Sequence, residues 1–419
     1  MAVDLVVIGL GYVGLPLAHQ AARSGLTVAG FDVDPTVVAG LNEGRSHIDD
    51  LTDDDVAELL ARGFVASTDP SVLDQADAVT ICVPTPLSPD GRADLRAVEA
   101  AAEEVGRRLR PGMLVVLEST SYPGTTNDVV RPILERSGLV AGADFALAFS
   151  PERIDPGNRT YGLGNTPKIV GGYTPACTER AARLYERFVP TVVRTKGTRE
   201  AEMAKLLENT YRHVNIALVN EMARFCHELG IDLWDAIRAA SSKPFGFQAF
   251  YPGPGVGGHC IPIDPNYLSQ SVRSTLGYPF RFVELAQEIN ATMPAYVARR
   301  AQNILNEAGL AINGATVLLL GVTYKRDISD QRESPAVPLA QALLQLGAKV
   351  IYHDPYVRQW SVGGADVPRV DDVEASVAEA DLTILVQDHR VYDAERLAAL
   401  ARRFFDTRGA TTSDRAYRL

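Results

Sequence analysis

Short runs of consecutive apolar residues recur along the first part of the chain and predict the strands of a parallel sheet. These runs are Leu5–Ile8, Leu26–Phe31, Asp77–Val83, Met113–Glu118 and Phe145–Phe149. A strand that is covered on both faces reads as an unbroken apolar run instead of an alternation of apolar and polar residues. Helical stretches such as Leu15–Ser24 separate the runs. The pattern therefore predicts a doubly wound α/β domain.

The first run leads directly into a glycine-rich turn, Gly9-Leu-Gly11-Tyr-Val-Gly14, and the second run ends at Asp32. Strand, G-x-G-x-x-G turn, helix, strand and acid stand in the order that dinucleotide binding requires. Gly9 permits the tight turn, Gly11 the approach of backbone to pyrophosphate, and Gly14 close packing of helix on strand. Asp32 would accept hydrogen bonds from a ribose diol and repel a 2′-phosphate, so the motif favours NAD over NADP. The alternative is a glycine-rich packing turn without a ligand.

The middle of the chain predicts one long helix. From Thr198 to Leu229 no proline interrupts the chain, and Gly230 supplies a C-terminal stop. Apolar residues recur there at three- and four-residue steps, at Leu207, Tyr211, Val214, Leu218, Met222, Phe225 and Leu229. A helix of about 31 residues would be roughly 46 Å long. A rod of that length usually connects domains or forms a subunit interface.

The last third of the chain repeats the first. Its apolar runs are Ala315–Leu320, Lys349–Asp354 and Asp381–Val386, in the same order as Val3–Ile8, Thr27–Asp32 and Asp77–Val83. The repeat lacks the G-x-G-x-x-G turn, so this second α/β domain could hold a different nucleotide. Lys325, Arg326 and Arg332 offer positive charge near its first strand end, although a charged loop is often only solvated.

A chain of 419 residues is too long for a single core. We expect an α/β fold of two Rossmann-like doubly wound domains joined by a long central helix with a small helical domain. The predicted boundaries are 1–195 for the nucleotide-binding domain, 196–300 for the helical domain and 301–419 for the second Rossmann-like domain.

Composition narrows the possible partners. The net charge of −11 argues against a nucleic-acid partner, which would need a basic surface. The longest apolar stretch near the N-terminus is too short and glycine-rich to span a bilayer. The four cysteines are widely spaced and the histidines show no ligand spacing, so we expect free thiols, no metal and a reducing, cytoplasmic location.

Polar residues follow the apolar runs at several strand ends. Thr85 follows the third run, Ser119 and Thr120 follow the fourth, and Glu152 follows the fifth. Ligands of doubly wound sheets bind beyond the carboxyl ends of the strands, so we expect these residues at one crevice. Each of them alone could be a helix cap or a turn former.

Cys260 ends a segment whose composition does not suit a regular helix or a central strand. The segment Tyr251–Cys260 holds four glycines and two prolines, and such a backbone suits the close approach of a ligand. A thiol at its end suits covalent catalysis, whereas the plain alternative is a small buried hydrophobic residue. Lys205 and Asn209 are four residues apart and share one helix face, which could equally be a solvated surface pair.

Together these features resemble the UDP-glucose/GDP-mannose dehydrogenase family over essentially the whole chain. The matching motifs are GLGYVGLPLA at 9–18, Ser119-Thr120, SPER at 150–153, Lys205-x-x-x-Asn209, GGHCIPIDP at 257–265 and GVTYKRDISDQRESP at 321–335. The resemblance implies an enzyme that oxidises the C6 alcohol of a nucleotide sugar to a carboxylate. Two NAD⁺ molecules would be reduced in turn at one site.

The resemblance also implies a role for each catalytic residue. Cys260 looks like the nucleophile that traps the aldehyde as a thiohemiacetal, which the second oxidation converts to a thioester. Lys205 and Asn209 look like the donors that stabilise negative charge on the C6 oxygen. A lysine near the thiol would also favour the thiolate.

Three further residues complete the implied chemistry. Asp264 and Thr120 resemble the pair that positions a water for proton transfer, and Glu152 resembles the carboxylate of thioester hydrolysis. The implied cofactor contacts are Gly9, Gly11, Tyr12, Val13, Gly14, Asp32, Val83, Pro84, Thr85, Ser119, Thr120 and, from the second Rossmann-like domain, Arg332. The implied substrate contacts are Glu152, Arg153, Lys205, Asn209, Phe250, Tyr251, Gly255, Gly257, Gly258, Cys260 and Lys325.

Two sugars stay open as substrates. The UDP-glucose branch commonly places a lysine before Asp264, where this chain has Ile263. Lys243-Pro-Phe-Gly-Phe and the Tyr-Pro-Gly-Pro-Gly run look more like the branch that acts on UDP-N-acetylhexosamines. Glucose and an N-acetylhexosamine therefore both remain candidate sugars of the substrate, and the base can be uracil, thymine or guanine.

Two other functions are alternatives. A two-electron NAD dehydrogenase or epimerase with an inert Cys260 would yield one NADH per sugar and resist thiol alkylation. An NAD-sensing regulatory protein on a Rossmann scaffold would leave the catalytic set without a purpose. We expect a nucleotide-sugar substrate, no nucleic acid, no membrane, and a homodimer built through the middle domain.

Overall fold

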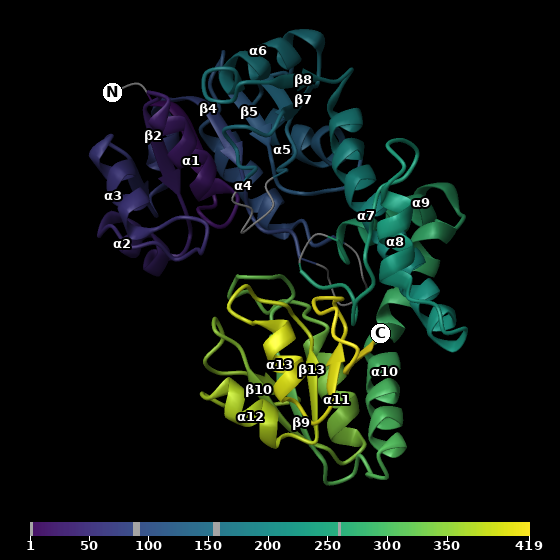
Figure 1. Ribbon diagram of the computed structural model, residues 1–419. Coiled ribbons are helices and arrows are strands. Elements are labelled where there is room, and N and C mark those ends of the chain that lie inside the picture. Colours follow the sequence, from purple (N-terminus) through teal and green to yellow (C-terminus); the bar gives the residue numbers. More distant parts are fainter. Residues whose placement is uncertain (1–2, 87–92, 154–159, 259–260) are drawn as a thin grey trace. The chain divides into compact units, whose positions relative to one another are not determined.

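The computed structural model describes residues 3–86, 93–153, 160–258 and 261–419, which form two compact units. The first unit runs up to Glu208 and also includes Asn266–Gly277. The second unit comprises Asn209–Pro265 and Tyr278–Leu419. Figure 1 labels many of the elements of both units.

A mostly parallel sheet forms the centre of the first unit. Its strands are β1 (Val3–Ile8), β2 (Val28–Phe31), β3 (Val65–Ser67), β4 (Ala76–Ile81), β5 (Leu114–Leu117), β6 (Ala146–Phe149), β7 (Lys168–Gly172) and β8 (Val192–Arg194). Within the described residues the sheet has eight strands in the order β3-β2-β1-β4-β5-β6-β7-β8. Neighbouring strands pair in parallel except β6 and β7, which are antiparallel.

Helices cover both faces of this sheet. They are α1 (Gly14–Arg23), α2 (Pro35–Asn42), α3 (Asp53–Ala61), the 3₁₀ segment η1 (Pro70–Gln75), α4 (Arg96–Arg107), the π-helical segment η2 (Thr125–Val130), α5 (Arg131–Glu135) and α6 (Pro175–Tyr185). Leu5 and Val7 of β1 pack in one core with residues of α1 and α6. Val6 and Ile8 pack in a second core with residues of α4 and α5. Successive side chains point to opposite faces of a strand, so the unbroken apolar run supplies both cores.

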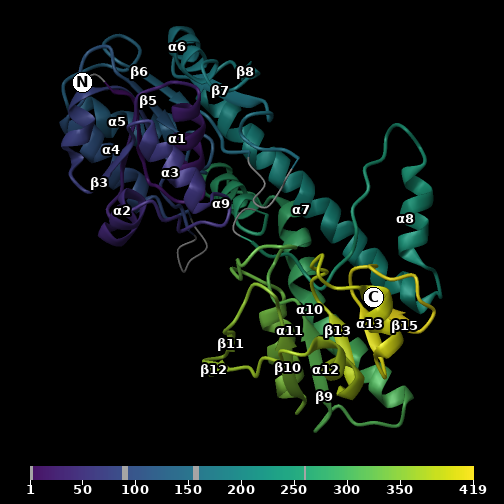
Figure 2. The same cartoon turned by 60° about the vertical axis from the view of Figure 1, so that its left-hand side comes forward.

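A single helix, α7 (Thr198–Glu228), continues from the first unit into the second and is 31 residues long. Figure 2 gives a second view of its unbroken ribbon. The chain leaves it at Gly230, whose φ of 69° is the left-handed conformation that ends helices without steric cost. The other helices of this region are α8 (Leu233–Ser241), α9 (Asp264–Leu276) and α10 (Arg281–Glu307).

A second parallel sheet forms the centre of the second unit. Its strands are β9 (Thr316–Leu320), β10 (Lys349–His353), β13 (Leu382–Leu385), β14 (Phe404–Asp406) and β15 (Ala416–Arg418), in the order β10-β9-β13-β14-β15. A separate antiparallel pair consists of β11 (Ser361–Val362) and β12 (Ala365–Asp366). The helices that accompany the sheet are α11 (Ala336–Gln345), α12 (Val373–Glu379) and α13 (Ala394–Leu400).

The two sheets share a topological core, as the sequence repeat predicts. The order β2-β1-β4 in the first sheet corresponds to β10-β9-β13 in the second, and both triplets are parallel. Every apolar run predicted as a strand lies on an observed strand. The α/β fold class with two Rossmann-like sheets and a long central helix is therefore confirmed. The three-domain boundaries at 195 and 300 stay a prediction.

None of the helices within the described ranges is both long enough and apolar enough to pass through a lipid bilayer.

Candidate active site

The glycine turn after β1 is shaped by backbone contacts. Gly9 has a φ of 86°, and a Cβ on it would lie 2.7 Å from the carbonyl oxygen of Cys82. A Cβ on Gly14 would lie 1.9 Å from the carbonyl oxygen of Gly9, so only glycine lets α1 begin here. A Cβ on Gly11 would meet no atom within 4 Å. The turn is thus closed at its two outer glycines and open at the middle one.

This turn fits a dinucleotide. The first turn of α1 has no side-chain cap, so its N–H groups and the positive end of the helix dipole can receive a phosphate. One oxygen of the Asp32 carboxylate accepts the Leu10 N–H at 2.8 Å, and the other accepts the Asp34 N–H at 2.9 Å. Each oxygen keeps a second lone pair for a ribose hydroxyl. Tyr12 and Val13, the other predicted contacts of the turn, lie between Gly11 and Gly14.

The ends of four strands form one row at the carboxyl edge of the first sheet. The row consists of Ile8, Ile81, Leu117 and Phe149, each paired in register with the next. The loops that follow these residues carry the glycine turn, Val83 to Thr85, Ser119 with Thr120, and Glu152. All of the polar strand ends predicted from the sequence therefore emerge at one edge of one sheet.

Hydrogen bonds hold these loops in place. The Ser119 hydroxyl donates to the carbonyl oxygens of Val83 at 2.8 Å and Ile81 at 3.3 Å, so it ties the β5 loop to the β4 loop. The Tyr267 hydroxyl of α9 donates to the Thr85 carbonyl. Thr120 is half-buried. The Ser119 hydroxyl thus has a structural role here, beside the cofactor contact that the resemblance implies.

The first part of α7 is anchored to the Glu152 loop. Lys205 is buried, and its Nζ donates to the Glu152 carbonyl oxygen at 2.7 Å. Arg153 pairs with Glu208 at 2.6 Å and donates to the Pro167 carbonyl at 2.7 Å. Two predicted site residues, Lys205 and Glu152, are therefore in contact.

Glu202, one turn before Lys205, was not predicted from the sequence. Its carboxylate is fully buried and accepts the N–H groups of Gly124 at 2.6 Å and Thr126 at 2.9 Å, and the Thr126 hydroxyl at 2.7 Å. It thus caps η2, which follows the Ser119-Thr120 loop. Burial raises the pKa of Glu202 to about 7, although these hydrogen bonds oppose the shift.

In the second unit two residues predicted separately for the site, Asn209 and Asp264, are in direct contact. The Asn209 Nδ2 donates to the Asp264 Oδ2 at 2.5 Å, and both residues are buried. Asp264 is the first residue of α9, where a carboxylate is favoured by the helix dipole. The amide of Asn209 is thereby oriented by a carboxylate, one helical turn after Lys205.

The glycines of the loop before Cys260 are explained by packing. A Cβ on Gly257 would lie 2.5 Å from the Glu333 carbonyl, and one on Gly258 would lie 2.6 Å from the Tyr324 ring. The Gly258 N–H also donates to the Arg332 carbonyl at 3.1 Å. The sequence interpretation attributed this glycine content to a ligand, but the loop needs these two glycines in order to lie against residues 324–333.

Contacts also constrain the earlier part of the loop. Gly255 has a φ of 142° and faces the Pro335 side chain, which a Cβ would approach to 2.9 Å. The Phe250 and Tyr211 rings pack edge to face at 5.7 Å, and Tyr251 is exposed. Aromatic side chains therefore flank the start of the loop.

Two predicted basic contacts lie on the loop after β9. Arg332 is exposed and pairs with Asp330 through two guanidinium nitrogens, the shorter contact being 2.6 Å. Lys325 is half-buried, and its carbonyl accepts the Thr323 hydroxyl at 2.7 Å. To contact a cofactor, the Arg332 guanidinium would have to leave Asp330 or bind the cofactor and Asp330 together.

Cys260, the predicted nucleophile, lies outside the described residues together with its neighbour His259. The other three cysteines, Cys82, Cys177 and Cys226, are free and buried. Burial raises the pKa of the Cys82 thiol far above its usual value, so that thiol is not a nucleophile.

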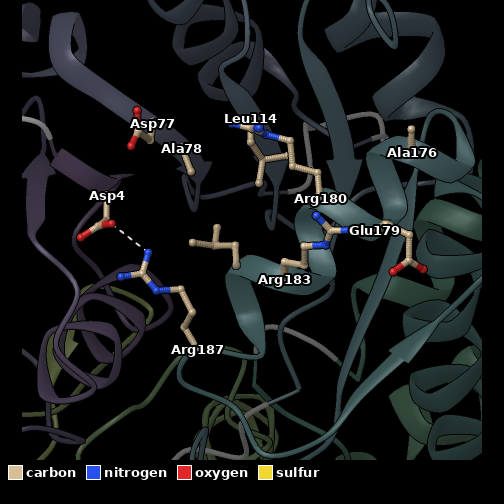
Figure 3. A pocket seen from close by; sticks show the side chains of 10 residues that line it. Asp4, Asp77, Ala78, Leu114, Ala176, Glu179, Arg180, Arg183 and Arg187 are labelled. Atoms are coloured by element: carbon tan, nitrogen blue, oxygen red, sulfur yellow. Dashed lines mark hydrogen bonds and ion pairs between the residues drawn. The ribbon is translucent and has the colours of Figure 1, made fainter.

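Among the cavities of the described residues, two differ in their position relative to the predicted site. The larger, of about 630 Å³, is at the amino edge of the first sheet (Figure 3), opposite the predicted site. Asp4 of β1 and Leu114 of β5 line it, and Asp4 pairs there with Arg187 at 2.8 Å. The smaller, of about 450 Å³, lies in the second unit beside Gly255 and His213. Burial lowers the pKa of His213 to about 4, so this imidazole is neutral.

One group of side chains in the described part of the chain has metal-like spacing. The ligand atoms of His19, Asp55 and Glu58 lie within 4.8 Å of one another. Arg62 and Arg23 contact the same Glu58 carboxylate at 2.9 and 3.5 Å. Two guanidinium groups at this distance oppose a bound cation, so the group carries no metal assignment.

Three sequence models of one family match the chain in succession. The UDP-glucose/GDP-mannose dehydrogenase family, NAD binding domain, matches residues 3–189. The central domain of the same family matches residues 199–292, and its UDP binding domain matches residues 318–413.

Individual relatives agree with this match. An NDP-N-acetyl-D-galactosaminuronic acid dehydrogenase of Ralstonia nicotianae is 36% identical over 98% of this chain and 96% of its own length. The solved structure of a UDP-D-ManNAc dehydrogenase from Pyrococcus horikoshii has a TM-score of 0.89 and 34% identity, covering 99% of this chain and 98% of the other. A UDP-glucose dehydrogenase from Pyrobaculum islandicum has a TM-score of 0.87 and 29% identity, covering 100% and 97%.

Proposed function

The chain belongs to the UDP-glucose/GDP-mannose dehydrogenase family, and we propose that it oxidises the C6 hydroxyl of a nucleoside-diphosphate hexose to a carboxylate. It is an NAD-dependent nucleotide-sugar dehydrogenase, and its first sheet carries the NAD-binding domain. The proposal adds that the reaction removes four electrons and passes through a covalent bond to Cys260. The observation that carries it is the buried pair Lys205 and Asn209, one turn apart on α7, with Asn209 held by Asp264.

The turn at Gly9–Gly14 and the Asp32 carboxylate would hold NAD⁺, which accepts a hydride when bound. The open space at Gly11 and the uncapped start of α1 support this assignment. Ser119 and Thr85 at the neighbouring strand ends would line the same edge. Arg332 is the proposed contact from the second Rossmann-like domain.

The proposed sequence of bond changes requires that an aldehyde be held. C6 first loses a hydride and its hydroxyl loses a proton, which gives the aldehyde. The Cys260 thiolate then adds to C6, and a second hydride loss converts the thiohemiacetal to a thioester. Water cleaves the C–S bond, which releases the carboxylate and returns the thiol. A bound thioester prevents escape of the aldehyde between the two oxidations.

The buried polar residues would serve distinct parts of this sequence. Lys205 and Asn209 would donate to the C6 oxygen while negative charge develops on it. Asp264 and Thr120 would hold the water that takes the hydroxyl proton, and Glu152 would act in thioester hydrolysis. The Asn209–Asp264 contact of 2.5 Å supports a shared role, because the carboxylate fixes the direction of the amide.

We propose a UDP-N-acetylhexosamine as the substrate. The relative from Ralstonia nicotianae and the structure from Pyrococcus horikoshii both carry names of N-acetylhexosamine dehydrogenases. UDP-glucose is the alternative, since the Pyrobaculum islandicum structure of a UDP-glucose dehydrogenase is also similar. Phe250, Tyr251, Gly255, Arg153 and Lys325 are the proposed substrate contacts.

The proposal is tested with Cys260→Ser and a panel of UDP-, dTDP- and GDP-hexoses. Wild-type protein should reduce NAD⁺ fastest with a UDP-N-acetylhexosamine. The variant should lose at least about 10³-fold in kcat. The reason is that the un-ionised serine hydroxyl is a far weaker nucleophile than a thiolate. NAD⁺ affinity, measured by protein fluorescence, should stay within about twofold, since the dinucleotide turn is untouched. Full turnover by Cys260→Ser would remove the covalent step from the proposal.

We also propose a homodimer built through the central helix. Leu218, Phe225 and Leu229 of the predicted apolar stripe are 52%, 44% and 69% exposed. Phe282 and Leu285 of α10, in the same unit, are exposed as well. Apolar side chains at this density on helices favour a second copy of the chain as the partner.

A cytoplasmic location is part of the proposal. Cys82, Cys177 and Cys226 are free thiols although all three are buried and well protected. Unpaired thiols are typical of reducing compartments.

A further inference from the structure

The Glu152 carboxylate belongs to a buried cluster of four side chains in the first unit, which we call the buried quartet. Its members are Glu118, Glu152, Lys168 and Tyr185, each at least nine-tenths buried. The Lys168 Nζ lies 2.7 Å from the Glu118 Oε2 and 3.5 Å from the Glu152 Oε2. The Tyr185 hydroxyl donates to the other oxygen of Glu118. One ammonium group is therefore shared between two carboxylates.

The charges of the buried quartet are fixed by one another. Burial alone would lower the pKa of Lys168, but the two carboxylates raise it, so the ammonium persists at any pH of interest. Burial raises the pKa of Glu118, and the Glu152 charge adds to that shift while Lys168 opposes it. Burial and Glu118 raise the pKa of Tyr185, so its hydroxyl stays a donor.

Stability alone does not account for such a cluster. Burying a lysine and two carboxylates costs several kcal/mol per ion before their attraction repays it, and apolar residues of the same volume are often as stable. The three supporting residues come from different elements, since Glu118 follows β5, Lys168 begins β7 and Tyr185 ends α6. They converge on a residue of the predicted site.

Other charged groups around Glu152 act on other atoms. The Lys205 ammonium of α7 binds the Glu152 carbonyl oxygen at 2.7 Å, and the Arg153 N–H donates to the Glu152 Oε1 at 2.6 Å. The Arg153 guanidinium is paired with Glu208 of α7. Cys82, after β4, is also near the Lys168 and Glu118 charges and is protonated. Among the residues that the structure describes, Lys168 is thus the cation that faces the Glu152 Oε2, at 3.5 Å.

We propose that Lys168 is a positioning residue for the reaction: it holds the Glu152 carboxylate as an anion in a fixed orientation for the hydrolytic step. Glu118 and Tyr185 in turn hold Lys168. This inference rests on the proposed function, because it assigns Glu152 to cleavage of the acyl intermediate.

The test compares Glu118→Gln with the double variant Glu118→Gln/Lys168→Met. The single variant keeps the ammonium, so its kcat is the reference against which the loss of Lys168 is measured. The double variant removes the ammonium without leaving a buried, unpaired Glu118, so the comparison isolates the effect of Lys168 on Glu152. Far-ultraviolet circular dichroism and NAD⁺ affinity confirm folding. If the double variant is unfolded, Glu118→Gln/Lys168→Gln, which can still hydrogen bond, replaces it.

A positioning role predicts a selective defect. The double variant should lose at least about tenfold in kcat with KM for NAD⁺ unchanged, and the acidic limb of its kcat–pH profile should move to higher pH. A double-mutant cycle with Glu152→Gln tests whether Lys168 acts through Glu152. In the Glu152→Gln background, removing Lys168 should change kcat less than twofold. Equal kcat and equal pH profiles in the single and double variants would overturn the proposal. So would an undiminished Lys168 effect in the Glu152→Gln background.

The proposed function and this inference fail in different ways. If the acyl intermediate forms, rapid mixing with the double variant should give an NADH burst followed by slow turnover, and intact-mass spectrometry should show the acylated chain. If wild-type protein makes only one NADH per sugar, the covalent scheme fails. The pH comparison and the Glu152→Gln cycle still decide whether Lys168 acts through Glu152.

Discussion

Single glycines in the two loops are required for different physical reasons. Gly14 faces the carbonyl of Gly9, so a side chain there is excluded by backbone. Gly258 faces the Tyr324 ring, so a side chain there is excluded by packing within the second unit. Gly11 faces open space and its φ is not left-handed, so neither packing nor backbone conformation requires a glycine there. These contacts separate the glycines that the fold requires from Gly11, for which we propose a role in NAD⁺ binding.

Alanine substitutions should distinguish these roles. Gly11→Ala should leave the free energy of unfolding within about 1 kcal/mol of wild type, because its Cβ meets no protein atom and φ is not left-handed. It should weaken NAD⁺ binding at least about tenfold by filling the space at the pyrophosphate. Gly14→Ala should lower unfolding stability by several kcal/mol, since its Cβ would lie 1.9 Å from an oxygen. Urea titrations measure the free energy of unfolding, and fluorescence titration measures the affinity for NAD⁺. Equal NAD⁺ affinity of wild type and Gly11→Ala would contradict this assignment.

Whole elements were predictable where hydrophobic pattern alone decides them. All of α7 follows from its periodicity, and eight strands follow from apolar runs: β1, β2, β4, β5, β6, β9, β10 and β13. Five further strands of the two sheets were not predicted. β7 begins with Lys168, and β3, β8, β14 and β15 are only three residues long. Their pairing is decided by neighbouring strands, which local sequence does not contain.

The site divides in the same way. The shared face of Lys205 and Asn209 follows from their helical spacing, and both residues are buried. Glu202 and Lys168 carried no such signal. Their partners lie about 76 and 50 positions away, at Thr126 and Glu118, so only the folded chain brings them together.

The cap on η2 makes a testable contribution to pH dependence. Glu202 has a pKa of about 7 in the folded state against 4.5 for an ordinary glutamate. Between these values the folded state binds a proton that the unfolded state has lost, so stability falls as pH rises through this window. The full difference is about 3 kcal/mol. Because Glu202→Gln removes the titration, its stability relative to wild type should improve by about 2–3 kcal/mol between pH 5 and pH 7.5.

Urea titrations at both pH values measure this change. Glu200→Gln, an exposed glutamate of the same helix, is the matched control and should track wild type at each pH. Parallel stability–pH curves for wild type and Glu202→Gln would show that Glu202 does not titrate in this range.

At the scale of the whole molecule, the repeated strand order gives the chain two sheets of the kind that binds nucleotides. The first sheet carries the glycine turn and the second lacks it, in keeping with a dinucleotide on one and a UDP binding domain on the other. Neither of these two roles accounts for the exposed apolar side chains on α7. A second copy of the chain would cover them.

The dimer proposal predicts a twofold mass. Wild-type protein in size-exclusion chromatography with light scattering should have twice the chain mass of 45.2 kDa. Leu218→Glu/Phe225→Glu should be a monomer, because two carboxylates would be desolvated in the interface. Val391→Glu changes a still more exposed apolar residue of the second unit and should remain dimeric. A monomeric wild-type protein at micromolar concentration would contradict the proposal.

The yield of NADH per sugar tests the central claim most directly. With limiting UDP-N-acetylhexosamine and excess NAD⁺, absorbance at completion counts the electrons removed from each sugar. The four-electron oxidation predicts two NADH per sugar, with no free aldehyde and one equivalent of uronic acid. One NADH per sugar, undiminished after alkylation of Cys260, would contradict it.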